Sequence, residues 1–451
     1  MPPRALSLIS SRKEALCANR TAPKALAFSA SGQIVVAATA LISLRVYTEL
    51  LDKAEFALAM MAMGGVALLD GVVVMALNQT LLSLCAALDG CERQREVATR
   101  LGWRLARLIV LVMAGLSAVL VAARFIIPLH PLIFFAPLLI VVYLGEEIAK
   151  TTMLGPMTAR REYPRFSLWA AVEAVVTLAV IAATLKMLRP DAVGFLLGLL
   201  AARLATTTGF MILFFGFSYF SGATQAPERK EVARALTYGL PLSVMAPLGW
   251  LNAFLDRYAI AFFSGLSSAA VYTAASGLVG RPYAITTSVL TNYFRPLLFE
   301  APGAGDARSR KRRLAQWLTA ASVIGFAGVA ALALLAKFVA ALILAPDFRA
   351  GATPILTVLG VAQTFAIMTH ALDNAILATG TSGRLLKLQA AMVVPALVLV
   401  PLGALLASGF GAALGRMASE AIRFGATVLL SRAALEPPPT KTSWSAAPCG
   451  S

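Results

Sequence analysis

The sequence predicts an all-α, polytopic membrane protein of about 12 transmembrane helices in two six-helix bundles around a central cavity. Of its 451 residues, 59% are hydrophobic and only 14% are charged, and the mean hydropathy is +0.78. A soluble domain is about one quarter charged. Apolar runs of roughly 20 residues recur along the chain, and each is long enough to cross a bilayer core of about 30 Å. These runs are continuous rather than alternating, which excludes a transmembrane β-barrel.

The elements follow from these apolar runs. We expect a basic cytoplasmic segment at 1–27, and then an uncleaved first helix, because the run that follows has full spanning length. The ninth span is long enough to be tilted or kinked. The proline-rich tail at 433–451 is predicted to be disordered and cytoplasmic. The twelve spans are predicted at 28–48, 56–80, 103–127, 131–155, 167–188, 192–219, 236–256, 268–294, 314–344, 352–377, 386–407 and 410–431.

A polar segment divides the spans into two groups of six. This segment, "FSGATQAPERKEVARA" at 220–235, is interpreted as a cytoplasmic linker between an N-terminal lobe at 28–219 and a C-terminal lobe at 236–432. Two repeats of six helices are a known plan of transporters, in which the substrate path runs between the halves.

The net charge of +17 follows the positive-inside pattern. With the N-terminus inside, predicted cytoplasmic segments hold 27 of the 39 Lys and Arg residues. Such a bias sets membrane orientation, so it accounts for the charge without a nucleic-acid partner, and it places both termini in the cytoplasm. The run "RSRKRR" at 308–313 is a cytoplasmic anchor and a candidate contact for anionic lipids.

Motifs of catalysis and metal binding are missing from the sequence. It contains no Walker A loop, HExxH or GxSxG, and its four cysteines have no metal or disulfide spacing. His130 and His370 are isolated, which favours packing roles over metal binding. We therefore expect no enzyme activity, no cofactor and no metal. The glycines of "GFGAALGR" are predicted to permit close approach of helices, namely Gly409, Gly411 and Gly415.

Charges inside the predicted spans are the informative positions, because ionisable groups in a membrane are costly and usually face a bundle interior or an aqueous cavity. Arginine suits a phosphate headgroup, since its planar fork binds two oxygens and stays charged. The competing interpretation is that these arginines reach an interface or pair with Asp70, Asp256 or Glu173. We predict a cationic, substrate-binding cavity formed by Arg45, Arg203, Arg257 and Arg281.

Other buried charges have different predicted roles. Asp70 and Glu173 lie deep and have no basic partner on their own helices, so they are candidates for ion coupling. Adjacent helix residues point about 100° apart, so Asp256 cannot pair with Arg257 across a helix face and is assigned to bracing a neighbouring helix. Helical spacing predicts further structural pairs, one between Glu146 and Lys150 and one through Arg416, Glu420 and Arg423.

Several segments resemble one transporter family. The segment 239–278 contains Gly-Leu-Pro at a helix start, then Asp-Arg, then Tyr-Thr-Ala-Ala near the next helix start. The first span junction at 43–83, the "YFRPLLFE" segment at 293–300 and the "NAILATGTSGRLL" segment at 374–386 add weaker matches. Together they resemble polysaccharide flippases of the multidrug/oligosaccharidyl-lipid/polysaccharide exporter superfamily.

The resemblance implies a V-shaped pair of lobes that flips an undecaprenyl-pyrophosphate-linked oligosaccharide across the bacterial inner membrane for O-antigen, lipopolysaccharide or exopolysaccharide synthesis. Arg45 and Arg257 occupy the matching cavity positions. The expected partners are the lipid-linked oligosaccharide, membrane lipids, and a polysaccharide polymerase with other assembly proteins, and we expect a monomer. Two alternatives remain open: a cation-coupled multidrug exporter of the same superfamily, and a non-transporting membrane scaffold of a polysaccharide assembly machine.

Overall fold

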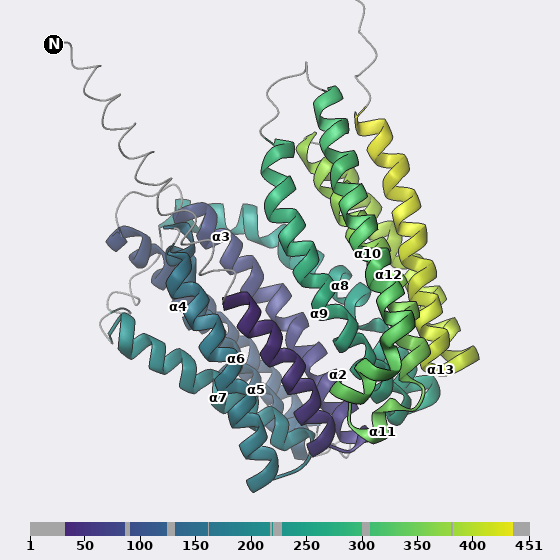
Figure 1. The fold of residues 1–451 in the computed structure, drawn as a ribbon. Helices are drawn as coiled ribbons and strands as arrows, with labels where there is room; N and C mark the ends of the chain where they lie inside the picture. The colour runs from purple at the N-terminus through teal and green to yellow at the C-terminus, as the bar shows by residue number, and fades with distance from the viewer. Residues whose placement is uncertain are drawn as a thin grey trace, which may run out of the picture. The chain divides into compact units, whose positions relative to one another are not determined.

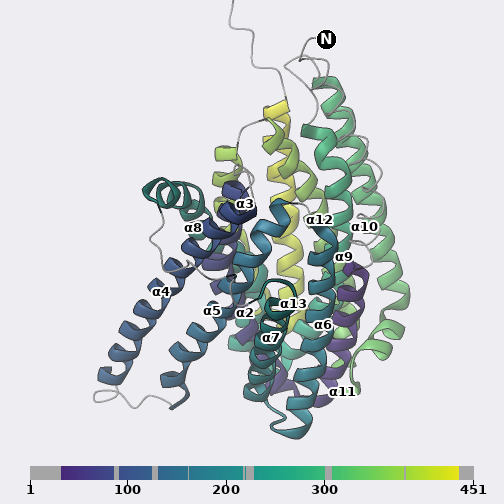
Figure 2. The same cartoon turned by 90° about the vertical axis from the view of Figure 1, so that its left-hand side faces the viewer.

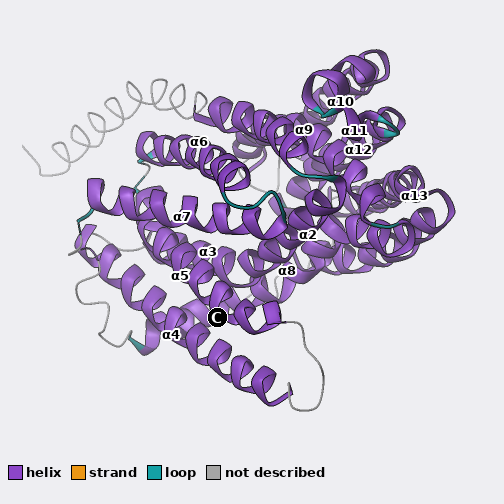
Figure 3. Cartoon of the chain, turned by 90° about the horizontal axis from the view of Figure 1, so that it is seen from below, coloured by secondary structure: helices purple, strands orange, loops and turns teal. Residues whose placement is uncertain are grey.

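The computed structural model describes residues 32–85, 91–123, 131–160, 162–216, 219, 228–299, 307–379 and 382–435. Within these residues the chain is helical and contains no strand (Figure 3). The prediction of an all-α protein is confirmed. The segment 1–27, His130 and most of the tail at 433–451 lie outside the described residues.

Helices overlap each of the twelve predicted span ranges. After the first helix, Gly32–Leu50, they are α2 (Lys53–Leu69), η1 (Asp70–Met75), α3 (Ala76–Cys85), α4 (Cys91–Ala123), α5 (Pro131–Ala159), α6 (Tyr163–Met187), α7 (Ala192–Phe214), α8 (Arg229–Ser264), α9 (Leu266–Phe299), α10 (Ala307–Ile343), α11 (Pro346–Arg349), α12 (Ala352–Ala378) and α13 (Ser382–Leu435). Among the described residues, eight helical stretches are long and apolar enough to cross a membrane. The chain is a multi-pass membrane protein.

Two helices extend beyond the boundaries that hydropathy predicts. Residues 229–235, expected in the linker, form the first turns of α8, and α10 begins at Ala307, so that the basic run 308–313 is helical. Lysine, arginine and alanine are good helix formers. Hydropathy locates the part of a helix that is suited to the bilayer, whereas these residues allow the helix to continue past it.

The helices group into two compact units. The first comprises residues up to Leu51 together with Ala62–Trp250, and the second comprises Asp52–Met61 together with the residues from Leu251 onward. In the first unit, α4 packs along α5 and α6 packs along α7 (Figure 2). Its core includes the fully buried Leu81 and Ala98, with Leu144 beside them.

The second unit is built around α12. This helix packs against α9, α10 and α13, the last two of which run beside it in Figure 1. Of its most apolar stretch, 56% is buried, the largest share among the candidate spans. Phe294 of α9 stacks on Trp317 of α10, with ring centroids 5.6 Å apart. These contacts fix α9, which carries several of the polar residues discussed below.

A sharp break divides α13 into two arms that correspond to the eleventh and twelfth predicted spans. The break falls at Ala407 and Ser408, the latter with a φ of 51°. A Cβ atom at Gly415 would lie 2.2 Å from the carbonyl oxygen of Leu399, and one at Gly411 would lie 2.0 Å from the carbonyl oxygen of Gly403, across the break. The predicted role of these two glycines in close helix approach is confirmed.

Candidate functional site

A network of buried and partly buried polar groups begins at Asp70 in the first unit. Asp70 is the first residue of the π-helical segment η1, and its Oδ2 accepts a hydrogen bond of 2.8 Å from the Tyr143 hydroxyl of α5. Its other oxygen, Oδ1, is buried and has no hydrogen-bond partner among the described residues. Because π-helical turns within α-helices often occur at functional sites, Asp70 is a candidate for one.

Arg203, predicted to line the cavity, lies in this same network. Its guanidinium forms an ion pair with Glu147 of α5 and lies 5.1 Å from the centroid of the Tyr143 ring. Glu147 is only 7% exposed. A carboxylate from a neighbouring helix therefore neutralises Arg203 without any ligand. The competing interpretation expected such pairing, but with Asp70, Asp256 or Glu173 rather than with Glu147.

Lys150 pairs with different partners from the one that its spacing predicts. Its Nζ lies 2.6 Å from Oε1 of Glu173 on α6 and 3.6 Å from Oε1 of Glu147. The expected pair with Glu146 does not occur among the ion pairs of the described residues, because the lysine side chain reaches across to α6. Glu173 thus finds its basic partner on another helix.

Glu146 completes this network. Its Oε1 accepts a hydrogen bond of 2.5 Å from Thr207 of α7, while its Oε2 is buried without a hydrogen-bond partner among the described residues. The network holds more carboxylates than cations, with Asp70, Glu146, Glu147 and Glu173 against Lys150 and Arg203. An uncompensated buried carboxylate is costly, so such an excess favours the uptake of a proton or another cation.

A second network lies in the other unit and is centred on Asp256. This residue is 4% exposed and accepts a hydrogen bond of 2.6 Å from the Tyr272 hydroxyl of α9. It also accepts the backbone N–H of Arg257 at 2.8 Å, and it lies 3.7 Å from Nη1 of Arg416 on α13. Asp256 thereby connects α8 to α9 and α13, which is the arrangement that a bracing role needs.

The charged face on α13 continues this network. Glu420 lies 3.3 Å from Arg416 and 3.9 Å from Arg423, at the spacing that the sequence predicts. Arg423 reaches Asp373 of α12 at 3.2 Å. Sequence reasoning missed Asp373, although a lone carboxylate inside the tenth predicted span was a usable signal.

The other three predicted cavity arginines lie outside these two ion-pair networks. Arg45 pairs with Glu49 one turn along its own helix. The Arg257 guanidinium lies 4.6 Å from the centroid of the Phe254 ring. Arg281 is exposed on α9, and its side chain forms no ion pair or hydrogen bond within the described part of the chain.

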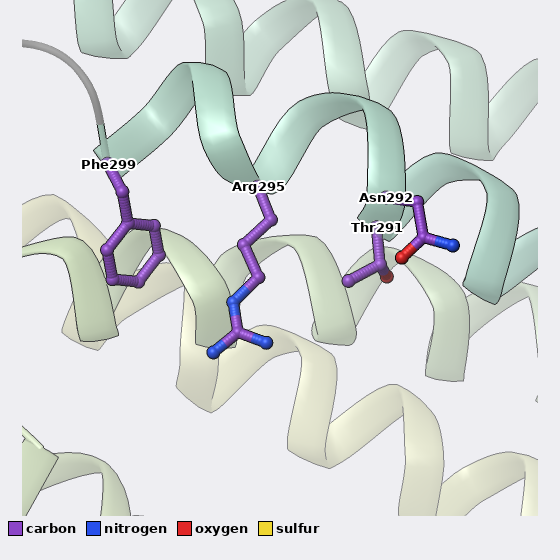
Figure 4. A pocket seen from close by; sticks show the side chains of 4 residues that line it. All are labelled: Thr291, Asn292, Arg295 and Phe299. Atoms are coloured by element: carbon purple, nitrogen blue, oxygen red, sulfur yellow. The ribbon is translucent and has the colours of Figure 1, made fainter. Parts of the chain in front are cut away.

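The C-terminal end of α9 carries a small pocket of about 330 Å³ that sequence reasoning did not find. Its described lining comprises Thr291, Asn292, Arg295 and Phe299, all from this helix (Figure 4). The Arg295 guanidinium lies 5.6 Å from the centroid of the Phe299 ring. The eighth predicted span ends at residue 294, so hydropathy places Arg295 among the charges of the following loop.

No group of three or more His, Cys, Asp or Glu residues is placed to hold a metal ion within the described ranges. His370 contacts Trp317 edge to face, with ring centroids 6.4 Å apart, which is a packing contact of an aromatic side chain.

No protein-family profile and no curated protein sequence matches this chain. Several solved structures, however, match this chain. An inward-facing multidrug resistance MATE family transporter of the MOP superfamily aligns with 89% of this chain and 95% of its own, at a TM-score of 0.62 and 16% identity. The chain has the fold of MOP superfamily transporters.

Two further structures share this fold. The lipid II flippase MurJ, in an inward closed conformation, has a TM-score of 0.63 and 11% identity over 90% of this chain and 87% of its own. A MOP superfamily transporter from Pyrococcus furiosus has a TM-score of 0.56 and 15% identity over 90% and 96% of the two chains. The fold therefore includes both drug transporters and a lipid flippase, and it does not separate these functions.

Proposed function

We propose that this protein is a flippase that moves a lipid-linked oligosaccharide with a pyrophosphate headgroup across the bacterial inner membrane. In this proposal the headgroup crosses through a water-filled path by alternating access, while the lipid tail stays in the bilayer. The shared fold with the lipid II flippase MurJ is compatible with a lipid-linked substrate. The partners are the lipid-linked oligosaccharide and, at the membrane, the enzymes that polymerise its sugars.

The observation that carries the proposal is the exposure of Arg281. It lies 15 residues after Leu266 and 18 residues before Phe299, about 22 Å and 27 Å from the two ends of α9. A charged side chain in contact with lipid at that depth is costly, so Arg281 favours a position on an aqueous path. Its planar fork suits a pyrophosphate, which supplies several anionic oxygens.

The other predicted arginines take different places in the proposal. Arg45 and Arg257 remain candidates for the mouth of the path, since each lies near the end of its predicted span. Arg203 belongs with the scaffold, because Glu147 already neutralises it. This assignment makes Arg281 the residue that contacts the headgroup at mid-membrane.

We propose that the carboxylate-rich network of the first unit couples transport to an ion gradient. Asp70 is the better proton carrier of the two predicted candidates, since one of its oxygens has no hydrogen-bond partner among the described residues. Glu173 is held by Lys150 at 2.6 Å. Protonation of Asp70 would remove one of the surplus negative charges from a buried environment.

A cation-coupled drug exporter is the second candidate. It is favoured by the shared fold with multidrug MATE transporters and by the carboxylate excess of the first unit. In that network, however, Glu146 and Glu147 are buried, and Glu147 and Glu173 are held in ion pairs. The exposed charges along α9 are arginines, which repel cationic drugs.

Reconstitution tests the proposal. Purified protein in vesicles should move a fluorescent undecaprenyl-pyrophosphate oligosaccharide between leaflets, and Arg281→Glu should abolish that movement because it reverses the charge on the path. Arg384→Glu, an equal charge reversal at an exposed site at the start of α13, is the matched control and should retain flipping.

The outcomes separate the candidates. If the wild-type protein leaves the lipid in place but exports organic cations, the drug-exporter hypothesis holds. If it transports neither, the scaffold hypothesis holds. If Arg281→Glu flips as well as Arg384→Glu, Arg281 does not contact the headgroup.

A further inference from the structure

One face of α9 carries a polar stripe, defined by Arg281, Ser288, Asn292 and Arg295. All four are exposed. Their spacings of 7, 11 and 14 residues place them within about 60° of arc around the helix and about 21 Å along it. The opposite face is buried, with the Tyr283 hydroxyl bonded to the Gly325 carbonyl at 3.0 Å and Phe294 stacked on Trp317. The stripe is therefore not required for packing within the second unit.

The stripe ends in the pocket of Figure 4. There, Thr291, Asn292 and Arg295 present two neutral hydrogen-bonding side chains and one guanidinium on adjacent turns of the helix. Phe299 lies one turn beyond Arg295 and contacts its guanidinium. A hydroxyl, an amide and an arginine fork are donors for phosphate oxygens.

An apolar flank runs beside the stripe. Ile285, Val289 and Tyr293 are 42%, 61% and 65% exposed on α9. A ligand that covers both surfaces must have a charged head and a long apolar chain. A polyisoprenyl pyrophosphate has this chemistry, whereas a free sugar phosphate has no use for the flank.

We propose that the pocket at Thr291, Asn292 and Arg295 is the loading site, where the pyrophosphate of the lipid-linked substrate first binds, with its isoprenoid chain along the apolar flank. The headgroup then moves along the stripe from Arg295 to Arg281. The positive-inside pattern places Arg295 at the cytoplasmic end, where the substrate is loaded. This inference rests on the proposed function and identifies where that function begins.

The test measures binding rather than transport. Purified full-length protein is titrated with farnesyl pyrophosphate in mixed micelles, and with inorganic pyrophosphate in a parallel titration. We expect farnesyl pyrophosphate to bind more tightly than inorganic pyrophosphate. Arg295→Met should weaken farnesyl pyrophosphate binding at least tenfold, because it removes a charge-assisted hydrogen-bonding group, and Arg295→Lys should give an intermediate value.

Arg384→Met is the control, since it removes one exposed positive charge from another helix of the same unit, α13. It should bind as the wild type does. Arg295 is exposed, so its variants should fold, and equal melting temperatures of the variants verify this. Equal affinities of the Arg295→Met and Arg384→Met variants would overturn the loading site, and so would equal affinities of the wild type for the two probes.

Failure of the loading site is distinguishable from failure of the proposed function. If Arg295→Met lowers affinity but the wild type moves no lipid-linked oligosaccharide in vesicles, the binding site stands and the flippase proposal fails. Suppose instead that the wild type flips its substrate, and that Arg295→Met binds farnesyl pyrophosphate and flips the substrate as well as the wild type does. The flippase proposal then stands and the loading site fails.

Discussion

Replacement of Gly415 by alanine should separate the two arms of α13. The added Cβ would lie 2.2 Å from the Leu399 carbonyl oxygen and 2.9 Å from the Val400 Cα. An ordinary close carbon–oxygen contact is about 3.3 Å, so the arms must move apart by about 1 Å. Overpacking of this kind costs about 1–3 kcal/mol.

Gly425 provides the matched control on the same helix. A Cβ there meets no atom within 4 Å. Both substitutions gain about 1 kcal/mol of helix propensity, so the difference between the two variants isolates the steric cost. We expect Gly415→Ala to melt several degrees below Gly425→Ala when both are heated in the same detergent.

The comparison uses apparent melting temperatures at one scan rate, because large membrane proteins often unfold irreversibly. A Gly415→Ala variant that melts at or above the temperature of Gly425→Ala would refute the close approach of the two arms.

Three further predictions follow from other parts of the chain. Arg203→Met should destabilise the protein by about 3–5 kcal/mol, because it leaves Glu147 without its main partner. Adding Glu147→Gln should recover most of this loss in thermal melts. A double variant that is no more stable than Arg203→Met contradicts the pairing. Asp191→Ala should cost about 1 kcal/mol at neutral pH, because the Asp191 Oδ1 accepts the Gly194 N–H at 2.8 Å and caps α7. Burial favours a higher pKa for Asp191, but the Gly194 N–H and the adjacent Arg189 outweigh burial and lower that pKa. The stabilising effect of Asp191 is therefore present above about pH 4 and is lost as the pH falls through the lowered pKa. If the difference in melting temperature between wild type and Asp191→Ala persists unchanged at lower pH, this reasoning is contradicted. Burial raises the pKa of Cys85 to about 11, so in a variant with the other three cysteines replaced by serine a maleimide should label it only after denaturation, and rapid labelling of the native protein would show that the thiol is accessible.

The sequence determined the helices of this protein because hydropathy is a local property. Every predicted span range overlaps a helix, and the spacing of Arg416, Glu420 and Arg423 correctly predicts their ion pairs along one helix face. The glycines after the α13 break were likewise interpretable, since small residues at a helix junction indicate close approach.

Tertiary structure decided the state of each buried charge. By sequence, Arg203 and Arg281 are equivalent, because both are arginines near the middle of an apolar span. In the structure Arg203 pairs with Glu147 of another helix, whereas Arg281 is exposed on α9. Lys150 pairs with Glu173 rather than with Glu146 for the same reason. The partner of a buried charge lies on a neighbouring helix many residues away, and only the packing of helices determines which side chains meet.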